Sequence, residues 1–457
     1  MRICVRLLLA LSLLGTVAAQ EPNSILKDWT GADRGPVPIT FFGLHINHEW
    51  HPFPPFPFGS YRFWDDHTRW QLIETGPDKW NWQEVDNWID LVTSHGVKDG
   101  TYILGGPPPW AVTLTGTENC DYSDPQRTRT PGQGMCRPPK DLGDDAAGPN
   151  LIWRKSVSTI ALHFKKSRMH ISSWEVWQEF VRHDLKGGRT SSWMGTNEQL
   201  VRLSQDAMCI ITGRGHVSAT HETCQQVLKS VGLNEPVDPS ALIIGPTAGI
   251  GHPLMDRRFE EYWETPGAAD SADIVGLHEY PMEPEQIYDY FPRWHTTLPK
   301  EVQAKPLWMT EGGWHNGSVT DPDMQEAWVV RFNLLVRGLG IGRMYWYSYD
   351  TKGLGELMDT KAGTGFNRIR EWMVGNTETG CSREGSVYTC NFAKPDGTPM
   401  IAVWDASQTC NGGQCSTTNF RVPARYTIYY TLDDTNSSAV RGGTVQVGAK
   451  PILLVGK

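Results

Sequence analysis

The 457-residue sequence lacks two features that would place it with nucleic-acid or membrane proteins. Its 42 lysines and arginines are outnumbered by 51 aspartates and glutamates, which gives a formal net charge of −9. Proteins that bind DNA or RNA usually carry a basic surface, so we expect no nucleic-acid partner. After the first 19 residues no apolar run approaches the roughly 20 residues of a membrane-spanning helix, so we expect no membrane span.

The N-terminus has the layout of a secretory signal. Arg2 and Arg6 precede the apolar run Leu7–Leu14, and the small residues Val17-Ala18-Ala19 follow it. The apolar run is too short to cross a bilayer but suits a cleaved signal peptide. We therefore predict a signal peptide over residues 1–19, a mature net charge of about −11, and a secreted or periplasmic protein.

Cysteine usage agrees with export. Cys4 leaves with the signal, and an even number of eight cysteines remains, which predicts disulfides in an exported chain. The simplest of many connectivities joins sequence neighbours, namely Cys120–Cys136, Cys209–Cys224, Cys381–Cys390 and Cys410–Cys415. No pair has CxxC spacing with nearby histidines, and the loop histidines His45, His48 and His51 lack a fourth ligand. We therefore predict no metal site.

Residues 38 to 373 alternate short apolar runs with amphipathic helical stretches, a pattern typical of βα units with a parallel sheet. Eight strands are expected, the number that closes a (β/α)8 barrel. They are Thr40–Leu44, Ser60–Phe63, Lys98–Leu104, Ser173–Trp177, Ala241–Ile244, Ile274–Leu277, Pro306–Met309 and Met344–Tyr347. The clearest helical stretches are Trp82–Ser94, Asn150–Lys166, Thr196–Thr212 and Met324–Leu339.

After Trp372 the composition shifts toward Gly, Thr, Ser and Asn, with short alternating runs. This predicts a small antiparallel, sandwich-like β domain whose edge pairs with the segment after the signal. The expected strands lie in Ser386–Phe392, Pro399–Trp404, Tyr426–Leu432 and Thr444–Val455. We thus expect an α/β TIM barrel over residues 20–374 and an accessory domain over residues 375–457.

Two glutamates end expected strands of the barrel. Glu179 closes the Trp-rich run Ile171–Phe180, where strand alternation places Glu175, Trp177 and Glu179 on one face. Glu311 closes a second run and precedes two glycines, which let the backbone come close to a ligand. Active sites of such barrels lie at the C-terminal ends of the strands. Two carboxyl groups about 5–5.5 Å apart there can cleave a glycosidic bond with retention.

With these motifs the chain resembles the clan A glycoside hydrolases, closest to family 39 with its β-xylosidases and α-L-iduronidases. The resemblance covers roughly residues 38–373. It implies Glu179 as acid/base, Glu311 as nucleophile, a carbohydrate substrate, and neither metal nor organic cofactor. Gln178 stands where the clan has Asn, and Phe180 where it usually has Pro. The longer Gln178 amide implies an altered ring position or a different sugar beside the nucleophile.

The resemblance also implies a set of supporting residues. Arg62 is expected to hydrogen-bond the nucleophile, His278 and Tyr280 to surround it, and Trp346 to form the floor under the sugar. His45 and Asn47 are expected to bind the terminal sugar. Trp110, after a Gly-Gly-Pro-Pro-Pro run, is expected to be either a sugar platform or a loop anchor.

The mechanism sets requirements on both glutamates. Glu179 must stay protonated, helped by apolar neighbours such as Trp177 and Phe180, and Glu311 must be ionised. Arg182, His183 and Lys186 either bind an anionic sugar or form a solvated loop. A transglycosylase on the same scaffold and a non-catalytic carbohydrate-binding barrel stay open as alternatives. The sequence gives no oligomeric state, sugar or linkage.

Overall fold

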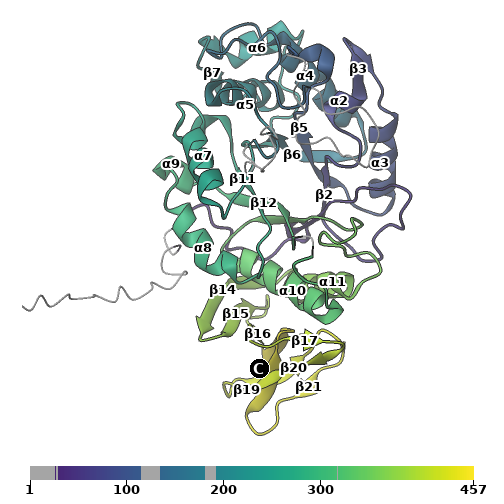
Figure 1. Cartoon of the computed structure of the whole chain (residues 1–457), viewed down its shortest axis with the longest axis vertical. Coiled ribbons are helices and arrows are strands. Elements are labelled where there is room, and N and C mark those ends of the chain that lie inside the picture. Colours follow the sequence, from purple (N-terminus) through teal and green to yellow (C-terminus); the bar gives the residue numbers. More distant parts are fainter. Residues whose placement is uncertain (1–25, 27–28, 115–133, 181–191, 316) are drawn as a thin grey trace, which may run out of the picture.

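The computed structural model describes residues 26, 29–114, 134–180, 192–315 and 317–457 (Figure 1). The expected signal peptide, Cys120 and the basic residues 182–186 therefore lie outside the described residues.

The core of the molecule is a parallel sheet that closes on itself. Its strand order is β10-β11-β12-β13-β1-β2-β5-β6-β9. A parallel bridge between Ile244 and Ile274, with a 3.0 Å hydrogen bond from Gly245 N to Ile274 O, joins β9 to β11 and completes the barrel. The predicted barrel is confirmed, and each of the eight predicted strands is present within a few residues of its expected bounds.

The barrel strands are β1 (Phe42–Leu44), β2 (Ser60–Phe63), β5 (Asp99–Leu104), β6 (His170–Val176), β9 (Leu242–Ile244), β11 (Val275–Glu279), β12 (Leu307–Gly312) and β13 (Arg343–Trp346). A ninth segment, β10 (Ala248–Gly249), pairs with β11 and has only two residues, so it left no pattern in the sequence. Two short hairpins, β3 (Glu74–Gly76) with β4 (Lys79–Trp80) and β7 (His216–Val217) with β8 (Glu222–Thr223), lie outside the barrel.

Figure 1 shows the helices on the outside of the barrel strands. They are α2 (Trp70–Ile73), α3 (Gln83–Ser94), α4 (Leu151–Lys166), α5 (Asn197–Thr212), α6 (Cys224–Ser230), α7 (Pro253–Glu264), α8 (Gln286–His295), α9 (Lys300–Gln303), α10 (Pro322–Gly338) and α11 (Lys361–Met373). The four predicted helices are α3, α4, α5 and α10. Among the described residues, no helix combines the length and the apolar character needed to cross a membrane.

Local sequence explains where the clearest helices begin and end. Thr196 and Gln199 form a reciprocal capping box at the start of α5, and Gly213 ends that helix with a left-handed φ of 75°. At α10, Asp321 caps two backbone N–H groups and Pro322 occupies the first turn, where its missing N–H costs nothing.

The C-terminal region forms the expected antiparallel β domain, drawn below α10 and α11 in Figure 1. One sheet has the order β14-β15-β16-β23-β20-β21, and β19 pairs separately with β22. Their bounds are β14 (Thr377–Glu384), β15 (Val387–Ala393), β16 (Pro399–Asp405), β19 (Thr417–Arg421), β20 (Tyr426–Tyr430), β21 (Ser438–Ala439), β22 (Thr444–Gly448) and β23 (Ile452–Gly456).

Two details of this domain refine the sequence interpretation. The run expected over Thr444–Val455 is two strands of different sheets, because Pro451 lacks the N–H that a continuous ladder needs. The expected pairing with the N-terminal segment is present as bridges from Pro36 to Thr377 and from Val37 to Val374.

Three of the expected disulfides are present. They join Cys209 to Cys224, Cys381 to Cys390, and Cys410 to Cys415. The last one links the short strands β17 (Cys410–Asn411) and β18 (Gln414–Cys415). Each closes a short loop, so these bonds fasten local structure rather than distant elements.

Candidate active site

A bulge in β12 points Glu311 into the barrel. The register runs from Leu277 opposite Met309 to His278 opposite Glu311, so Thr310 is the extra residue. Strict alternation would place Glu311 on the same outward face as Met309. The bulge moves the Glu311 carboxylate to the inner face instead, as bulges beside active sites commonly do.

The end of β6 is irregular in a different way. Trp177 has φ 66° and Glu179 has φ 43°, a left-handed conformation that is uncommon for residues other than glycine. The predicted face of Glu175, Trp177 and Glu179 is therefore wrong at Trp177, whose indole leaves the barrel to bond the carbonyl of Ser192. The same turn brings Gln178 and Glu179 both toward the site. Such strained residues cluster at functional sites.

Arg62 lies at the centre of the cluster, on β2 and fully buried. Its Nη1 donates to Glu311 Oε1 at 2.8 Å. Its Nε and Nη2 form a bidentate pair with Glu175, at 2.9 and 2.6 Å, and Nη2 also donates to Gln178 Oε1 at 3.1 Å. The buried carboxylates raise the pKa of Arg62, so the guanidinium stays charged. The Arg62 guanidinium thus bonds three side chains: Glu175 on β6, Gln178 just after β6, and Glu311 on β12.

His278 and Tyr280 complete the surroundings of Glu311. Tyr280 donates its hydroxyl to Glu311 Oε2 at 2.9 Å, and burial beside that carboxylate raises the pKa of Tyr280 well above its usual value. His278 Nδ1 lies 3.1 Å from Glu179 Oε1 and 3.3 Å from Glu311 Oε2. Its Nε2 faces Arg62 Nη2 at 3.5 Å. Because arginine only donates, Nε2 can accept from Arg62 only in the tautomer whose proton is on Nδ1, the nitrogen that faces the two carboxylates.

The two glutamates come close enough to influence each other. One oxygen of Glu179, one of Glu311 and one nitrogen of His278 all lie within 4.8 Å of one another. Burial raises the pKa of Glu311, the negative Glu179 adds to this rise, and His278 and Arg62 oppose it. Carboxyl groups this close lose their protons as a pair. Direct donors favour the charge on Glu311, since Arg62 and Tyr280 both bond that carboxylate.

The loop after β1 contributes further residues to the cluster around Arg62. His45 Nε2 lies 3.1 Å from Arg62 Nη1, and burial together with Arg62 holds the pKa of His45 well below its usual range. Asn47 Nδ2 donates to the hydroxyl of Tyr347 at 3.3 Å, and Tyr347 donates in turn to Asp65 Oδ2 at 2.7 Å. The expected pair His45 and Asn47 is therefore brought to the cluster, together with Tyr347 and Asp65.

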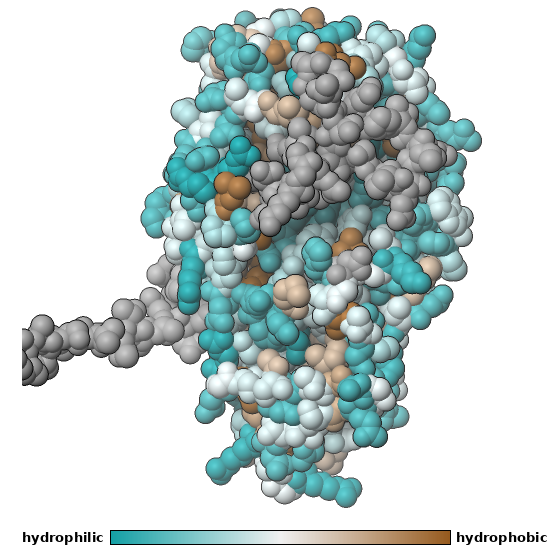
Figure 2. All heavy atoms as spheres, viewed as in Figure 1, coloured by the Kyte–Doolittle hydropathy of each residue, from teal (hydrophilic) through white to brown (hydrophobic). Residues whose placement is uncertain are grey.

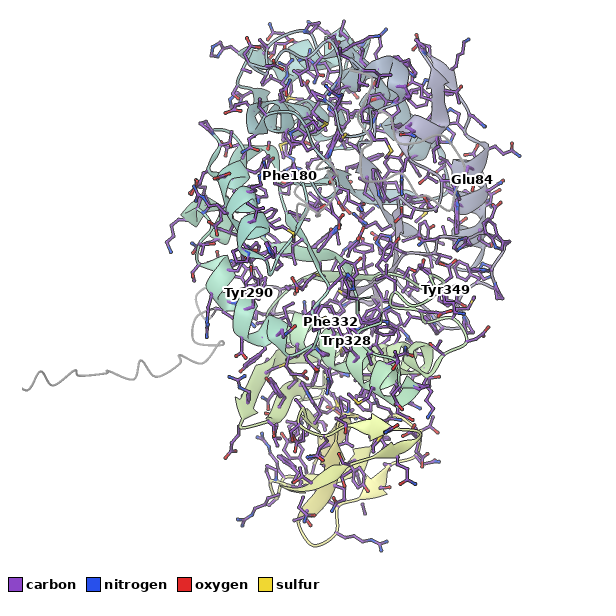
Figure 3. The ribbon with its side chains drawn as sticks, viewed as in Figure 1. Glu84, Phe180, Tyr290, Trp328, Phe332 and Tyr349 are labelled. Atoms are coloured by element: carbon purple, nitrogen blue, oxygen red, sulfur yellow. A yellow bond between two sulfur atoms is a disulfide. The ribbon has the colours of Figure 1, made fainter. Side chains whose placement is uncertain are left out.

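Trp346 is not in the cluster, which corrects the expectation of a tryptophan floor. It is fully buried behind β13, and its ring packs edge-on against Trp328 on α10, at 5.7 Å between centroids. Trp328 and Phe332 in Figure 3 mark the part of α10 that covers it. Because Tyr345 already points inward, alternation turns Trp346 outward and brings Tyr347 to the mouth of the barrel.

Three other residues that were expected at the site, Trp110, Phe180 and Gly313, make structural contacts instead. Trp110 Nε1 donates to the carbonyl of Glu74 at 3.2 Å, which favours the loop-anchor interpretation over the sugar platform. Phe180, labelled in Figure 3, packs against α7, with its ring centroid 5.3 Å from that of Tyr262 and 6.1 Å from that of Phe259. Gly313 approaches protein rather than ligand, since a Cβ there would lie 2.5 Å from Tyr347 O.

Glu175 and Tyr347 are the site residues that the sequence did not assign a role. Strand alternation placed Glu175 inside the barrel but gave no partner, and its pairing with Arg62 needs the register of β2, β5 and β6. Thr247 supports it by donating to Glu175 Oε1 at 2.8 Å. The position of Tyr347 at the barrel mouth could have been predicted only if the inward orientation of Tyr345 had been known.

Two sets of donor atoms in the described ranges are compact enough to consider for a metal ion at the barrel mouth. The first is Glu179, His278 and Glu311, where the adjacent Arg62 cation disfavours a second positive charge. The second is His48, His51 and Asp350. There the Asp350 carboxylate already accepts N–H donors from both imidazoles and from two backbone amides, so its lone pairs are satisfied without an ion.

The structure is a barrel with an accessory β domain and a carboxylate pair at the strand ends. These features can be compared with those of known proteins. No protein-family model and no curated protein matches the sequence. Solved structures do match. A family 39 glycoside hydrolase from Bacteroides cellulosilyticus WH2 covers 92% of this chain and 81% of its own, with a TM-score of 0.59 at 15% identity.

Two further structures agree with it. A glucosidase from Croceicoccus marinus has a TM-score of 0.54 at 11% identity, covering 93% of this chain and 97% of its own. A family 39 β-xylosidase from Caulobacter crescentus has a TM-score of 0.51 at 14% identity, covering 93% and 99%. At such identities the likeness establishes the fold. The chain has the barrel architecture of these glycoside hydrolases, as its motifs indicated.

Proposed function

We propose that this protein is a secreted retaining glycoside hydrolase that cleaves O-glycosidic bonds in an oligosaccharide or polysaccharide. The observation that carries the proposal is the spacing of the carboxyl groups, with oxygens of Glu179 and Glu311 within 4.8 Å. Retaining enzymes place these groups about 5–5.5 Å apart, whereas inverting enzymes need roughly 6.5–9.5 Å to admit a water molecule. The glycosidase neighbours support a carbohydrate substrate.

In this mechanism Glu311 attacks the anomeric carbon while Glu179 protonates the departing oxygen. Arg62 and Tyr280 hold Glu311 as the carboxylate, since each donates to a different oxygen of it. Once the glycosyl ester forms, Glu311 loses its negative charge, and Glu179 becomes the stronger acid. Glu179 can then take a proton from water, whose oxygen displaces Glu311 from the sugar.

Gln178 is proposed to bind the sugar hydroxyl next to the anomeric carbon. Its Oε1 accepts from Arg62 at 3.1 Å, which orients the amide and turns its two N–H donors away from the guanidinium. The clan's asparagine has the same amide on a shorter side chain. A donor fixed in this way can strengthen its bond to the hydroxyl in the transition state.

We also propose the division into a signal over residues 1–19, a catalytic barrel over 20–374 and an accessory domain over 375–457. The three disulfides support a protein made for an oxidising compartment. The separate sheet that begins at Thr377 supports the second boundary.

The nucleophile can be tested by mass spectrometry after incubation with a panel of activated 2-fluoro glycosides. We expect a covalent sugar on the peptide that contains Glu311, and no label in the Glu311→Gln variant. An active enzyme labelled on a different carboxylate would contradict the assignment.

The acid/base can be tested with leaving groups of different basicity. Glu179→Ala should slow substrates with poor leaving groups far more than activated aryl glycosides, and added azide should restore turnover. Glu235→Ala, which removes an exposed carboxylate away from the site, is the matched control. Equal losses on both substrate classes without azide rescue would exclude this role for Glu179.

A further inference from the structure

The loop after β1 leads from the catalytic cluster to an exposed tryptophan. His45 contacts Arg62 and Asn47 contacts Tyr347, and three residues later the chain reaches Trp50. The Trp50 side chain is 68% exposed, the largest exposed fraction among the exposed large hydrophobics of the described residues. Leaving an indole in water forgoes roughly 2 kcal/mol or more of burial free energy, so its position calls for a reason.

The base beneath Trp50 is rigidly built. The fully buried carboxylate of Asp350 accepts hydrogen bonds from His48 Nδ1 at 3.0 Å and His51 Nδ1 at 3.1 Å. The same carboxylate accepts from the backbone N–H groups of Asn47 and His48, both at 2.9 Å. The Trp50 ring centroid lies 4.8 Å from that of His48 and 5.9 Å from that of His51. The loop therefore presents the indole in a fixed place.

The chemistry of this surface fits a sugar ring. An indole face offers an apolar plane for the C–H face of a pyranose, with little rotamer entropy to lose. His51 uses Nδ1–H toward Asp350, which leaves Nε2 as the acceptor for a sugar hydroxyl at the ring edge. Figure 2 shows one face of the molecule, on which hydrophobic residues are scattered among polar ones.

We propose that Trp50, held in place through His48, His51 and Asp350, is the stacking platform of a distal sugar subsite. Five residues of extended chain reach at most about 18 Å from His45, which a short oligosaccharide can span from the catalytic carboxylates. The substrate is then a chain of several sugars, and affinity rises with its length. This inference rests on the proposed glycosidase function and adds to it the length of the sugar chain that the protein binds.

The test uses the full chain with Glu311→Gln, which blocks turnover and leaves binding measurable. Its affinity for β-1,4-linked xylose and glucose oligosaccharides of one to six units is measured by calorimetry and on a glycan array. We expect affinity to rise with length. Adding Trp50→Ala should lower affinity for the longer chains by about tenfold or more and leave monosaccharide binding within about twofold. Trp50→Phe should restore most of the loss.

The matched control is Leu242→Ala, which removes an exposed apolar side chain at the first residue of β9, the opposite end of the barrel. It should bind all lengths like the parent. Three results would overturn the platform: no binding by the Glu311→Gln chain, equal affinities with and without Trp50, or an equal loss at every length. Labelling of Glu311 by 2-fluoro monosaccharides reports the catalytic proposal separately, so either proposal can fail alone.

Discussion

Replacing Tyr280 with phenylalanine removes one oxygen atom from the site and should move the acidic limb of its pH profile upward. The Tyr280 hydroxyl donates to Glu311 Oε2 at 2.9 Å, and this bond forms with the ionised carboxylate. A hydrogen bond to a charged group contributes roughly 1.5–3 kcal/mol. At 1.36 kcal/mol per unit, its loss should raise the pKa of Glu311 by about 1–2 units.

The sign follows from which form reacts. In the proposed mechanism only the ionised Glu311 attacks, so the expected rate falls as pH drops through its pKa, which burial already raises above its usual value. A higher pKa in Tyr280→Phe therefore shifts the acidic limb to higher pH. The same bond stabilises the fold only where Glu311 is ionised. Tyr280→Phe should thus destabilise the protein above that pKa and have little effect on stability below it.

The assay is the pH dependence of covalent labelling by a 2-fluoro glycoside with a dinitrophenolate leaving group. Such a leaving group needs no proton from Glu179, so the acidic limb reports the nucleophile alone. Tyr347→Phe is the control, since its hydroxyl bonds Asp65 rather than Glu311. An unmoved limb in Tyr280→Phe, or an equal shift in both variants, would refute the reasoning.

Three further variants, two in the barrel and one in the β domain, test what stabilises the fold. Trp346→Ala should cost about 3–5 kcal/mol in urea unfolding, because it empties a fully buried site, while the labelling rate stays near that of the parent; a selective loss of labelling would return Trp346 to the site. Glu175→Gln should cost about 3 kcal/mol, since it leaves buried Arg62 half paired; unchanged stability would argue against that ion pair. Replacing Cys381 and Cys390 by alanine should lower stability by about 2–3 kcal/mol relative to the oxidised parent, and the reduced parent, which also loses the Cys209–Cys224 and Cys410–Cys415 disulfides, should lose more; an unchanged stability of the double variant would contradict this.

The strands and the meeting of Glu179 and Glu311 at the strand ends could be predicted from the sequence, because apolar runs and strand-end carboxylates leave local patterns. The orientations around them could not. Trp346 and Tyr347 are neighbours, and only the contact of Tyr345 with Thr101 inside the barrel decides which of them faces the mouth. Glu311 points inward because of a bulge at Thr310, and no residue type in the sequence indicates this bulge.

The carboxylate partners of Arg62 could not be predicted in full either, because they depend on the register between strands. Arg62 was expected to bind the nucleophile, yet more of its donors go to Glu175 than to Glu311. Sequence alternation showed that Glu175 enters the barrel. It could not show that the Arg62 side chain reaches Glu175, because the spacing between them depends on the register of β2 and β6 with β5.

Charge balance at the site bears on the roles proposed for the two glutamates. Glu175 and Arg62 form a bidentate pair, and Arg62 also donates to Glu311. Burial raises the pKa of Glu311, and the negative charge of Glu179, with an oxygen within 4.8 Å, adds to this rise. Tyr280 and Arg62 both donate to Glu311 and so favour the charge there. Under the proposed mechanism, this preference suits Glu311 to the role of nucleophile and Glu179 to the role of acid/base.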